Sequence, residues 1–363
     1  MKRLVLLLSL IAVLITTSCN RQRPLSFGTV QYVSTDKVDY VVDPSSGSDV
    51  SFVVDGVEYF QIIGPYLVIL SYAEEGLFAV LDKTPPYTVL GYFFKRGRGP
   101  GELPSISIPG DYGIDDSGDL YADLNNLAGK IIRWNITKSL EEGRTVTEEI
   151  GETGSNTLTV LNLGEKGIYY KELSPNKDSQ QRFVIDNNSQ KYVPENMRLL
   201  NSAVLQNKED DGARFNILST VTVYDRQTER FMEASSGLNT IHLYSLDNSF
   251  AKTYCIGDKV YDYNELAERS YADRPITTID GKHNGKFASF LYLDVLMSAF
   301  ARPESIPRLL IVPWDGSDLI QVQLPEFVTS FDIDLDSGRL YCYNSFTEIL
   351  KSYDIRVILD RIK

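Results

Sequence analysis

The chain has 363 residues, and 43% of them are hydrophobic, which is enough for a substantial core and argues against global disorder. Acidic residues outnumber basic residues by 49 to 36, and a chain with a net charge of −13 is a poor candidate for binding nucleic acid. With three cysteines and two histidines, the composition excludes a disulfide scaffold and most zinc sites.

The N-terminus carries the features of a secretory signal. Lys2 and Arg3 precede an apolar run over residues 4–15, which is shorter than a membrane-spanning helix and fits the apolar part of a signal peptide. Small residues then lead to Cys19. This pattern resembles the lipobox of bacterial lipoproteins, in which the cysteine is lipidated, although Thr16 stands where an aliphatic residue is more usual. The alternative is an ordinary secretory signal with a coincidental cysteine.

The lipobox interpretation divides the chain into a signal peptide at residues 1–18, a tether at residues 19–30 and one domain at residues 31–358. Cys19 is followed by Asn20, whereas the signal that retains many lipoproteins in the inner membrane has Asp at that position. We therefore expect a lipid-anchored protein of the cell envelope, at the outer membrane, whose contact with the membrane is the lipid on Cys19.

Short apolar runs separated by turn residues begin the domain. Four such runs lie within residues 62–94, and the segments between them contain Gly, Pro and Glu. This rhythm predicts a meander of four antiparallel strands. It continues along the chain and predicts six units, at residues 56–103, 104–150, 151–192, 214–257, 278–324 and 325–358. Units of this length are typical of the blades of a β-propeller.

An internal repeat supports this interpretation. Residues 116–121 (DSGDLY) recur as residues 336–341 (DSGRLY), about four blade lengths further on. The sequence thus predicts an all-β fold, a six-bladed β-propeller of four-stranded antiparallel blades. Short helical insertions are expected at residues 195–206, 261–274 and 294–302. Because the last unit shows only three strands, we expect residues 32–42 to pair into it, which would close the ring and remove open sheet edges.

A glycine-rich turn follows the fourth strand of the first unit, with the sequence Lys95-Arg96-Gly97-Arg98-Gly99-Pro100-Gly101-Glu102. A Gly-x-Gly-Pro-Gly-Glu turn behind a lipoprotein signal resembles the TolB-like six-bladed β-propeller lipoproteins of Bacteroidetes-type bacteria. The motif covers residues 97–102, and the blade rhythm extends the resemblance over most of the domain. The resemblance implies a propeller at the cell envelope and no particular activity, since the role of that family is largely unassigned.

Two roles are open for this turn. In the structural role, which we favour, the glycines adopt φ values denied to other residues, Pro100 stiffens the turn and Glu102 accepts hydrogen bonds from its free N–H groups. In the binding role, the cationic side chains of Lys95, Arg96 and Arg98 hold an anionic sugar, a carboxylate or a phosphate together with exposed N–H groups.

An acidic run near the C-terminus suggests a calcium loop. Asp332, Asp334 and Asp336 alternate along the chain, but an EF-hand needs a glycine directly after the third aspartate and a glutamate at its twelfth position. Ser337 and Tyr343 stand there instead. We interpret the run as a polar strand edge followed by an Asx turn, and predict no metal.

The histidines and tryptophans are isolated along the chain, so neither a catalytic triad nor a metal cluster is indicated. His242 lies in a strand-like run and is expected to be partly buried, whereas His283 lies in a turn-like segment and is expected to be exposed. Trp134 is expected in the core. Trp314 precedes a hairpin turn and is the better candidate for an exposed aromatic residue that stacks on a sugar.

The two cysteines that follow Cys19 both lie in strand-like runs, at Cys255 and Cys342. A disulfide between them is permitted in an envelope compartment. We favour buried free thiols that act as small hydrophobic side chains.

These features favour a binding or interaction module without catalysis, cofactor or metal. It would be a monomeric ring that presents loops and insertions at one end to a protein or glycan partner. The alternative is a propeller enzyme, a hydrolase, lyase or lactonase, with carboxylates and possible calcium in the central channel. An enzyme predicts carboxylates with perturbed pKa values in the channel, and a binding module predicts an aromatic or apolar patch at one end. A purely structural envelope component is a third alternative.

Overall fold

A computed structural model of the chain describes residues 25–51, 54–97, 102–103, 110–126, 129–154, 157–173, 179–203, 205, 217–300 and 302–362. The expected signal peptide and Cys19 lie outside these ranges, as do Arg98, Gly99, Pro100 and Gly101. Within the described part of the chain, no helix combines the length and the apolar character that crossing a membrane requires.

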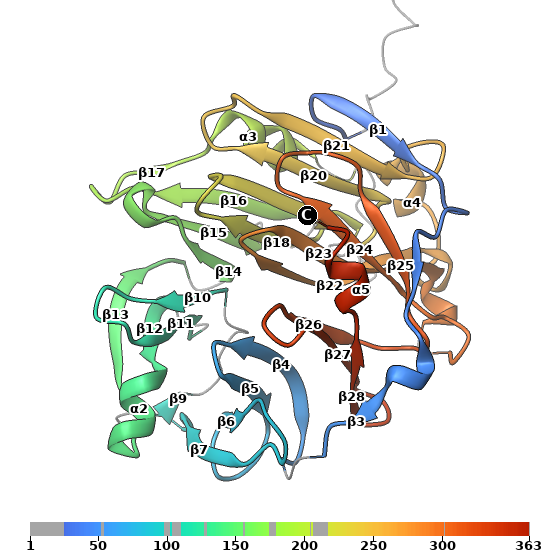
Figure 1. Cartoon of the computed structure of the whole chain (residues 1–363). Helices are drawn as coiled ribbons and strands as arrows, with labels where there is room; N and C mark the ends of the chain where they lie inside the picture. The colour runs from blue at the N-terminus through green and yellow to red at the C-terminus, as the bar shows by residue number, and fades with distance from the viewer. Residues whose placement is uncertain are drawn as a thin grey trace, which may run out of the picture.

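Six antiparallel sheets surround a central axis, so the prediction of a six-bladed β-propeller is confirmed (Figure 1). The first three blades are β4 (Val57–Ile63), β5 (Tyr66–Ser71), β6 (Phe78–Asp82) and β7 (Val89–Phe93); β10 (Asp111–Ile114), β11 (Leu120–Asn125), β12 (Lys130–Asn135) and β13 (Thr147–Glu152); and β14 (Thr157–Asn162), β15 (Ile168–Leu173), β16 (Gln180–Ile185) and β17 (Lys191–Tyr192).

The other three blades follow in the same order. They are β18 (Thr220–Asp225), β19 (Arg230–Ser235), β20 (Thr240–Ser245) and β21 (Ala251–Ile256); β22 (Pro275–Asn284), β23 (Phe287–Leu296), β24 (Arg308–Pro313) and β25 (Ile320–Gln323); and β26 (Ser330–Asp334), β27 (Arg339–Asn344) and β28 (Ile349–Asp354). The first strand of each blade is the innermost one, and it contacts the first strand of the neighbouring blades.

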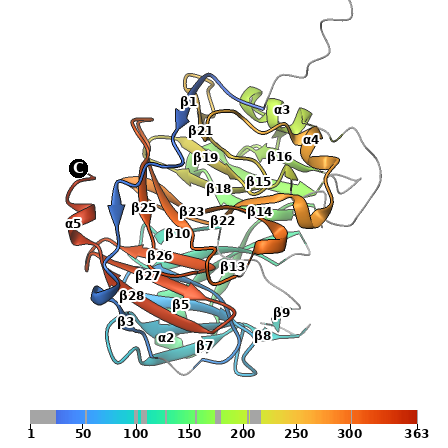
Figure 2. The same cartoon turned by 90° about the vertical axis from the view of Figure 1, so that its right-hand side faces the viewer.

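The N-terminal segment adds a strand to three consecutive blades. β1 (Thr29–Val33) pairs in parallel with β21, β2 (Tyr40–Val41) pairs in parallel with β25, and β3 (Ser48–Asp49) pairs antiparallel with β28. Figure 2 shows this segment running along the outside of the ring.

The prediction that residues 32–42 complete the last blade was wrong, because they pair with the fourth and fifth blades and Ser48–Asp49 takes that place. An extended chain covers about 3.3 Å per residue, so the segment is long enough to satisfy the unpaired groups of three edges in turn.

The core lies between adjacent blades. Because the blades cover one another, many of the middle strands are largely buried, as in β20, where all six residues are buried. This explains why the sequence shows short continuous apolar runs rather than strict alternation. Trp134 is fully buried between the first two blades, with its ring centre 5.3 Å from those of Phe78 and Phe94. The expectation that Trp134 belongs to the core is confirmed.

The repeated hairpin turns have the expected chemistry. In the β10–β11 turn, the side chain of Asp115 accepts hydrogen bonds from the N–H groups of Ser117 and Asp119, at 2.9 and 3.0 Å. Gly118 in this turn and Gly338 in the β26–β27 turn have φ values of 88° and 68°, which favour glycine. Cys255 and Cys342 are buried free thiols, as expected.

Short helical insertions lie in the connections between strands. We call the end at which the innermost strands begin the entry face, and the opposite end the exit face. The insertions α4 (Tyr263–Ala267), η4 (Tyr271–Asp273) and η5 (Met297–Ala299) lie in connections at the entry face, and α3 (Glu195–Ser202) precedes β18. All four fall within segments that were expected to be helical. The structure adds η1 (Pro44–Ser46), α2 (Ile136–Glu142), η2 (Gly164–Lys166) and α5 (Arg356–Leu359), which the sequence analysis missed.

Candidate functional site

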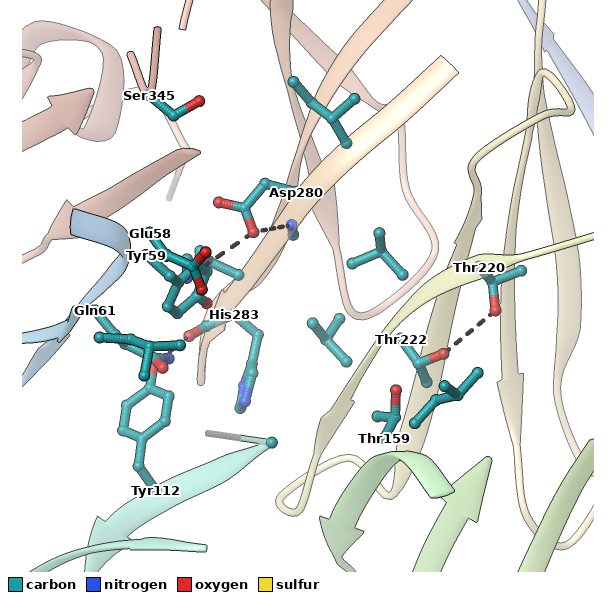
Figure 3. A pocket seen from close by; sticks show the side chains of 18 of the residues that line it. Glu58, Tyr59, Gln61, Tyr112, Thr159, Thr220, Thr222, Asp280, His283 and Ser345 are labelled. Atoms are coloured by element: carbon teal, nitrogen blue, oxygen red, sulfur yellow. Dashed lines mark hydrogen bonds and ion pairs between the residues drawn. The ribbon is translucent and has the colours of Figure 1, made fainter. Parts of the chain in front are cut away.

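The central channel opens at the entry face into a hollow of about 830 Å³. Five of the innermost strands line it, and Ser345, in the turn between β27 and β28, adds the sixth blade. Figure 3 shows Gln61, Tyr59 and Asp280 on one side of the hollow and three threonines on the other. The polar lining consists of Glu58, Tyr59, Gln61, Tyr112, Thr159, Thr220, Thr222, Asp280, Lys282, His283 and Ser345.

Three ionisable side chains lie near one another in the channel wall: Asp280 and Lys282 line this hollow, and Asp332 lines a cavity at the exit face. Strand alternation places Asp280 and Lys282 on the same face of β22, and Asp332 comes from the neighbouring innermost strand β26. The Lys282 Nζ lies 3.9 Å from the Asp280 Oδ1 and 3.4 Å from the carbonyl oxygen of Phe60. It also lies 3.6 Å from the ring centre of Tyr59. We call Asp280, Lys282 and Asp332 the channel cluster.

Burial brings the pKa values of Asp280 and Lys282 to about 7. It raises the pKa of Asp280 to about 7, against hydrogen bonds from the Ser330 hydroxyl and from the backbone N–H of Phe331. Burial also raises the pKa of Asp332 and lowers that of Lys282, while the attraction between these two groups opposes both shifts. The cluster can therefore exchange protons near neutral pH, as the enzyme alternative requires.

Gln61 and His283 bring unpartnered polar atoms to the channel wall. The Gln61 side chain is 4% exposed, and its Oε1 has no hydrogen-bond partner among the residues that the structure describes. The Nδ1 of His283 also has no hydrogen-bond partner among the described residues. A buried oxygen left in this state costs about 1–3 kcal/mol unless a bound molecule supplies a donor. This hollow is thus built to receive hydrogen bonds from a ligand or from water.

The channel narrows at Tyr112 and His283, which line both this hollow and a second one of about 360 Å³ at the exit face. The Tyr112 hydroxyl donates to the carbonyl oxygen of His283 at 3.2 Å. His283 was expected to be exposed, but it is partly buried here, and burial lowers its pKa to about 4.

Charged groups in the exit-face hollow pair with one another. Arg226 forms an ion pair with Asp111, and Lys83 lies 3.0 Å from Asp334 and 3.3 Å from Asp336. The Asp334 side chain also accepts from the N–H of Asp336 at 3.2 Å, as expected for an Asx turn. Lys83 thus forms ion pairs with two of the three aspartates in the run that resembles a calcium loop. The described residues contain no group of three or more side chains suited to a metal ion.

An apolar groove of about 400 Å³ adjoins the entry-face hollow, and the two share Ile279 and Ser345. Its apolar lining comes from the helical insertions and from neighbouring blades, and consists of Ile217, Leu266, Tyr271, Ile276, Met297, Phe300 and Phe346. Phe346 is 61% exposed. This groove matches the aromatic or apolar patch that a binding module predicts.

The described ends of the glycine-rich turn, residues 95–97 and 102–103, lie outside the lining of the channel hollows. Lys95 and Arg96 form β8 (Lys95–Arg96), which pairs in parallel with β9 (Glu102–Leu103). Both are exposed and neither lines the channel hollows, and the Arg96 guanidinium lies 4.7 Å from the ring centre of Tyr72. A Cβ added to Gly97 would lie 2.0 Å from the Glu102 Oε2. The close approach supports a structural role for Gly97 and Glu102.

Trp314 is not an exposed aromatic residue, so this expectation was wrong. It is 3% exposed and packs in the core cluster between the fourth and fifth blades, with its ring centre 6.3 Å from that of His283. The hairpin turn that follows folds against the neighbouring blade, where Gly316 approaches Phe250, and this covers the indole. His242, expected to be partly buried, is completely buried.

The sequence analysis missed Gln61 and the channel cluster. The available signal was the alternation of Thr278, Asp280 and Lys282, three polar residues two positions apart. The residues between them, Ile279 and Gly281, are not polar. Such a pattern indicates a strand with one polar face. It does not indicate that the polar face is enclosed, since only the ring puts it there.

Comparison with known proteins supports the fold. No family model and no curated protein matches the chain. A putative exported protein from Bacteroides fragilis is 11% identical, with 90% of this chain and 100% of that chain covered and a TM-score of 0.51. A DUF4221 family member from Bacteroides vulgatus is 10% identical, with 92% and 98% covered and a TM-score of 0.52. At these identities the similarity concerns the propeller fold alone.

Proposed function

We propose that this protein is a ligand-binding propeller of the bacterial cell envelope and that the entry-face hollow of its channel binds a glycan. The observation that carries this proposal is the channel hollow, whose described lining includes hydroxyl groups and the Gln61 amide, and in whose wall the buried Gln61 Oε1 has no partner within the described chain. Sugar hydroxyl groups both donate and accept hydrogen bonds, so they suit such a lining.

The size and charge of the hollow favour a neutral ligand. Its volume of about 830 Å³ lies in the range of ligand pockets, about 300–1,000 Å³. Lys282 faces the carboxyl groups of Asp280 and Asp332, and burial lowers the pKa of Lys282 itself, so the channel cluster does not favour an anionic sugar. The walls of the hollow are strands of a closed ring. Few protein groups therefore need to become ordered when a ligand binds.

The test is calorimetric titration of the mature chain, residues 19–363, with neutral oligosaccharides of two to four units, built from glucose, galactose, mannose, xylose or N-acetylglucosamine. The Gln61→Leu variant should bind about fivefold more weakly, because one hydrogen bond contributes about 1 kcal/mol. Its unliganded stability should be maintained or increased, since an unsatisfied buried oxygen is removed. Gln323→Leu, in the outer strand β25, is the matched control. Absence of binding by every sugar would refute the proposal.

A second candidate is an enzyme that acts on the same ligand. It is favoured by the channel cluster, in which two carboxyl groups with raised pKa values face a lysine with a lowered one. Such groups suit general acid–base chemistry near neutral pH. Release of products from the bound oligosaccharide, lost in the Asp280→Asn variant while binding is retained, would establish this candidate in place of simple binding.

We also propose that lipid on Cys19 anchors the propeller at the outer membrane. The support is the signal-like N-terminus that ends at this cysteine, followed by Asn20. Expression of the whole chain in a bacterium that is fed an alkyne-labelled fatty acid should label the wild type and leave the Cys19→Ala variant unlabelled. Equal labelling of the two would refute lipidation at Cys19.

A further inference from the structure

We propose that the ligand is amphipathic: a saccharide unit occupies the entry-face hollow while an uncharged apolar substituent, of the size of a phenyl or short alkyl group, fills the adjoining groove. This inference rests on the proposed function and adds a second subsite to it. Its basis is that a hollow lined by both polar and apolar side chains and a groove lined mainly by apolar side chains share one wall.

The two cavities are continuous at Ile279 and Ser345, which line both. From this border, β22 continues into the hollow with Asp280 and Lys282, whereas Ile276 in the same strand lines the groove. A single molecule that lies across the border would therefore meet hydrogen-bonding groups at one end and apolar groups at the other.

An aromatic cluster stands beside the groove. The ring centres of Phe300, Phe327 and Phe346 are 5.9 to 6.1 Å apart. Phe346 and Tyr271, which both line the groove, keep large exposed fractions in the absence of a ligand. An apolar substituent that covers these rings would remove their surface from water, which is favourable.

The lining of the groove favours an apolar substituent. Arg274 is the cationic side chain in its described lining, and the Nε and Nη2 of Arg274 donate to the carbonyl oxygen of Arg269 at 3.1 and 2.9 Å. Arg274 is 6% exposed, so it presents little surface to the groove. The exposed part of the lining is supplied by side chains such as Phe346 and Tyr271, against which an apolar group loses no hydrogen bonds.

The experiment compares each sugar of the oligosaccharide panel as its methyl glycoside and as its phenyl glycoside, by calorimetry on the mature chain. Phenyl glycosides should bind at least about tenfold more tightly than methyl glycosides, because the phenyl ring is taken from water into the groove. This increment should disappear in Phe346→Ser and Ile276→Ser, while the affinity for methyl glycosides is unchanged. Val357→Ser, which alters a 70% exposed side chain of α5, is the control and should retain the increment.

The possible results separate this inference from the proposed function. Equal binding of methyl and phenyl glycosides would overturn the groove subsite and leave glycan binding in place. Failure of both kinds of glycoside to bind would overturn both proposals. Binding of phenol or of a phenylalanine-containing tripeptide as tightly as the phenyl glycosides would also overturn the inference, since the sugar would then contribute nothing. Because Phe346 is exposed, its variant should fold normally and decides the matter if Ile276→Ser is unstable.

Discussion

Two buried lysines in this propeller illustrate different uses of the same chemistry. Lys171, in β15, and Lys282, in β22, are both removed from water, and burial lowers the pKa of each. Lys171 donates to the carbonyl oxygen of Thr220 at 2.5 Å and to the hydroxyl oxygen of the same residue at 3.3 Å. The contacts of Lys282 are longer, at 3.4 and 3.9 Å, and its side chain lines an open hollow.

The neighbours of Lys171 are also saturated with hydrogen bonds. The Arg182 Nε lies 3.0 and 2.8 Å from the two carboxylate oxygens of Glu233, which also accepts from the hydroxyl groups of Thr220 and Tyr244 at 2.6 Å. Burial opposes ionisation of Glu233, but Arg182, Lys171 and these hydroxyl donors together lower its pKa to about 2. We call Lys171, Arg182 and Glu233 the interblade cluster.

The comparison teaches that hydrogen-bond saturation, rather than charge, distinguishes the two lysines. The interblade cluster uses its donors and acceptors within the protein, as a structural network does. In the channel wall, the carboxyl oxygens of Asp280 and Asp332 also accept hydrogen bonds from the protein. Lys282, with its longer contacts, and Gln61, whose Oε1 has no partner among the described residues, keep hydrogen-bonding capacity beside a cavity, as a binding site does. The predictions below would sharpen this distinction or break it.

The largest expected effect is on the interblade cluster. Glu233→Gln removes the partner of the buried Arg182 guanidinium and should lower the free energy of unfolding by about 3 kcal/mol or more. Urea unfolding of the mature chain measures this. Asp336→Asn, at the exposed carboxylate of a surface ion pair, is the control and should cost less than about 1 kcal/mol. Similar costs for both variants would contradict the structural role of the interblade cluster.

An intermediate effect should separate the two lysines. Lys171→Met leaves the Thr220 carbonyl without its lysine donor and removes a charge that stabilises the Glu233 carboxylate, and it should lower the free energy of unfolding by about 1–3 kcal/mol. Lys282→Met should change it by less than about 1 kcal/mol, since an amine with long contacts is replaced by an apolar chain, but it should weaken glycan binding. The distinction fails if the two variants lose the same stability in urea unfolding.

A smaller effect concerns the pH dependence of stability, with opposite signs for Lys171 and Asp280. The pKa of Lys171 is about 7 when folded against 10.5, so the unfolded chain holds more protons between these values and stability should rise with pH there. The pKa of Asp280 is about 7 when folded against 3.8, so the folded chain holds more protons and stability should fall as pH rises from about 4 to 7.

Unfolding free energies at pH 4.5, 7 and 9.5 check both signs. Lys171→Met should reduce the rise above pH 7, to which Lys282 also contributes because burial lowers its pKa to about 7. Asp280→Asn should reduce the fall below pH 7, to which Asp111 also contributes because burial raises its pKa to about 7. A wild-type profile that each variant reproduces unchanged would show that these two groups do not titrate as their burial requires.

Much of the architecture could be predicted because its signals are local. Apolar runs of strand length, turns such as the one that Asp115 stabilises, and the recurrence of residues 116–121 each depend on neighbours in the sequence. They led to six blades and to the positions of the main insertions. The helix α2 was missed because its start depends on one cap, in which the Asn135 side chain accepts from the N–H of Lys138 at 2.8 Å.

The candidate site could not be predicted in the same way. Gln61 and Asp332 are 271 positions apart in the chain, yet Asp332 accepts a hydrogen bond from the N–H of Ile62 at 2.7 Å. That contact exists because the first and last blades meet when the ring closes. Trp314 was misjudged for a related reason, since its turn looks exposed in sequence and is covered by a neighbouring blade.

The sequence by itself determined the kind of fold, the number of blades and the signal-like N-terminus, because strand formation and turn geometry depend on nearby residues. Tertiary structure alone decided which blade edges the N-terminal strands cover, which polar side chains share the channel, and that an apolar groove lies against the polar hollow. These features depend on contacts between residues far apart in the chain. Closure of the ring brings such residues together, and burial between blades then gives their charges and hydrogen-bonding groups the properties on which the proposed function rests.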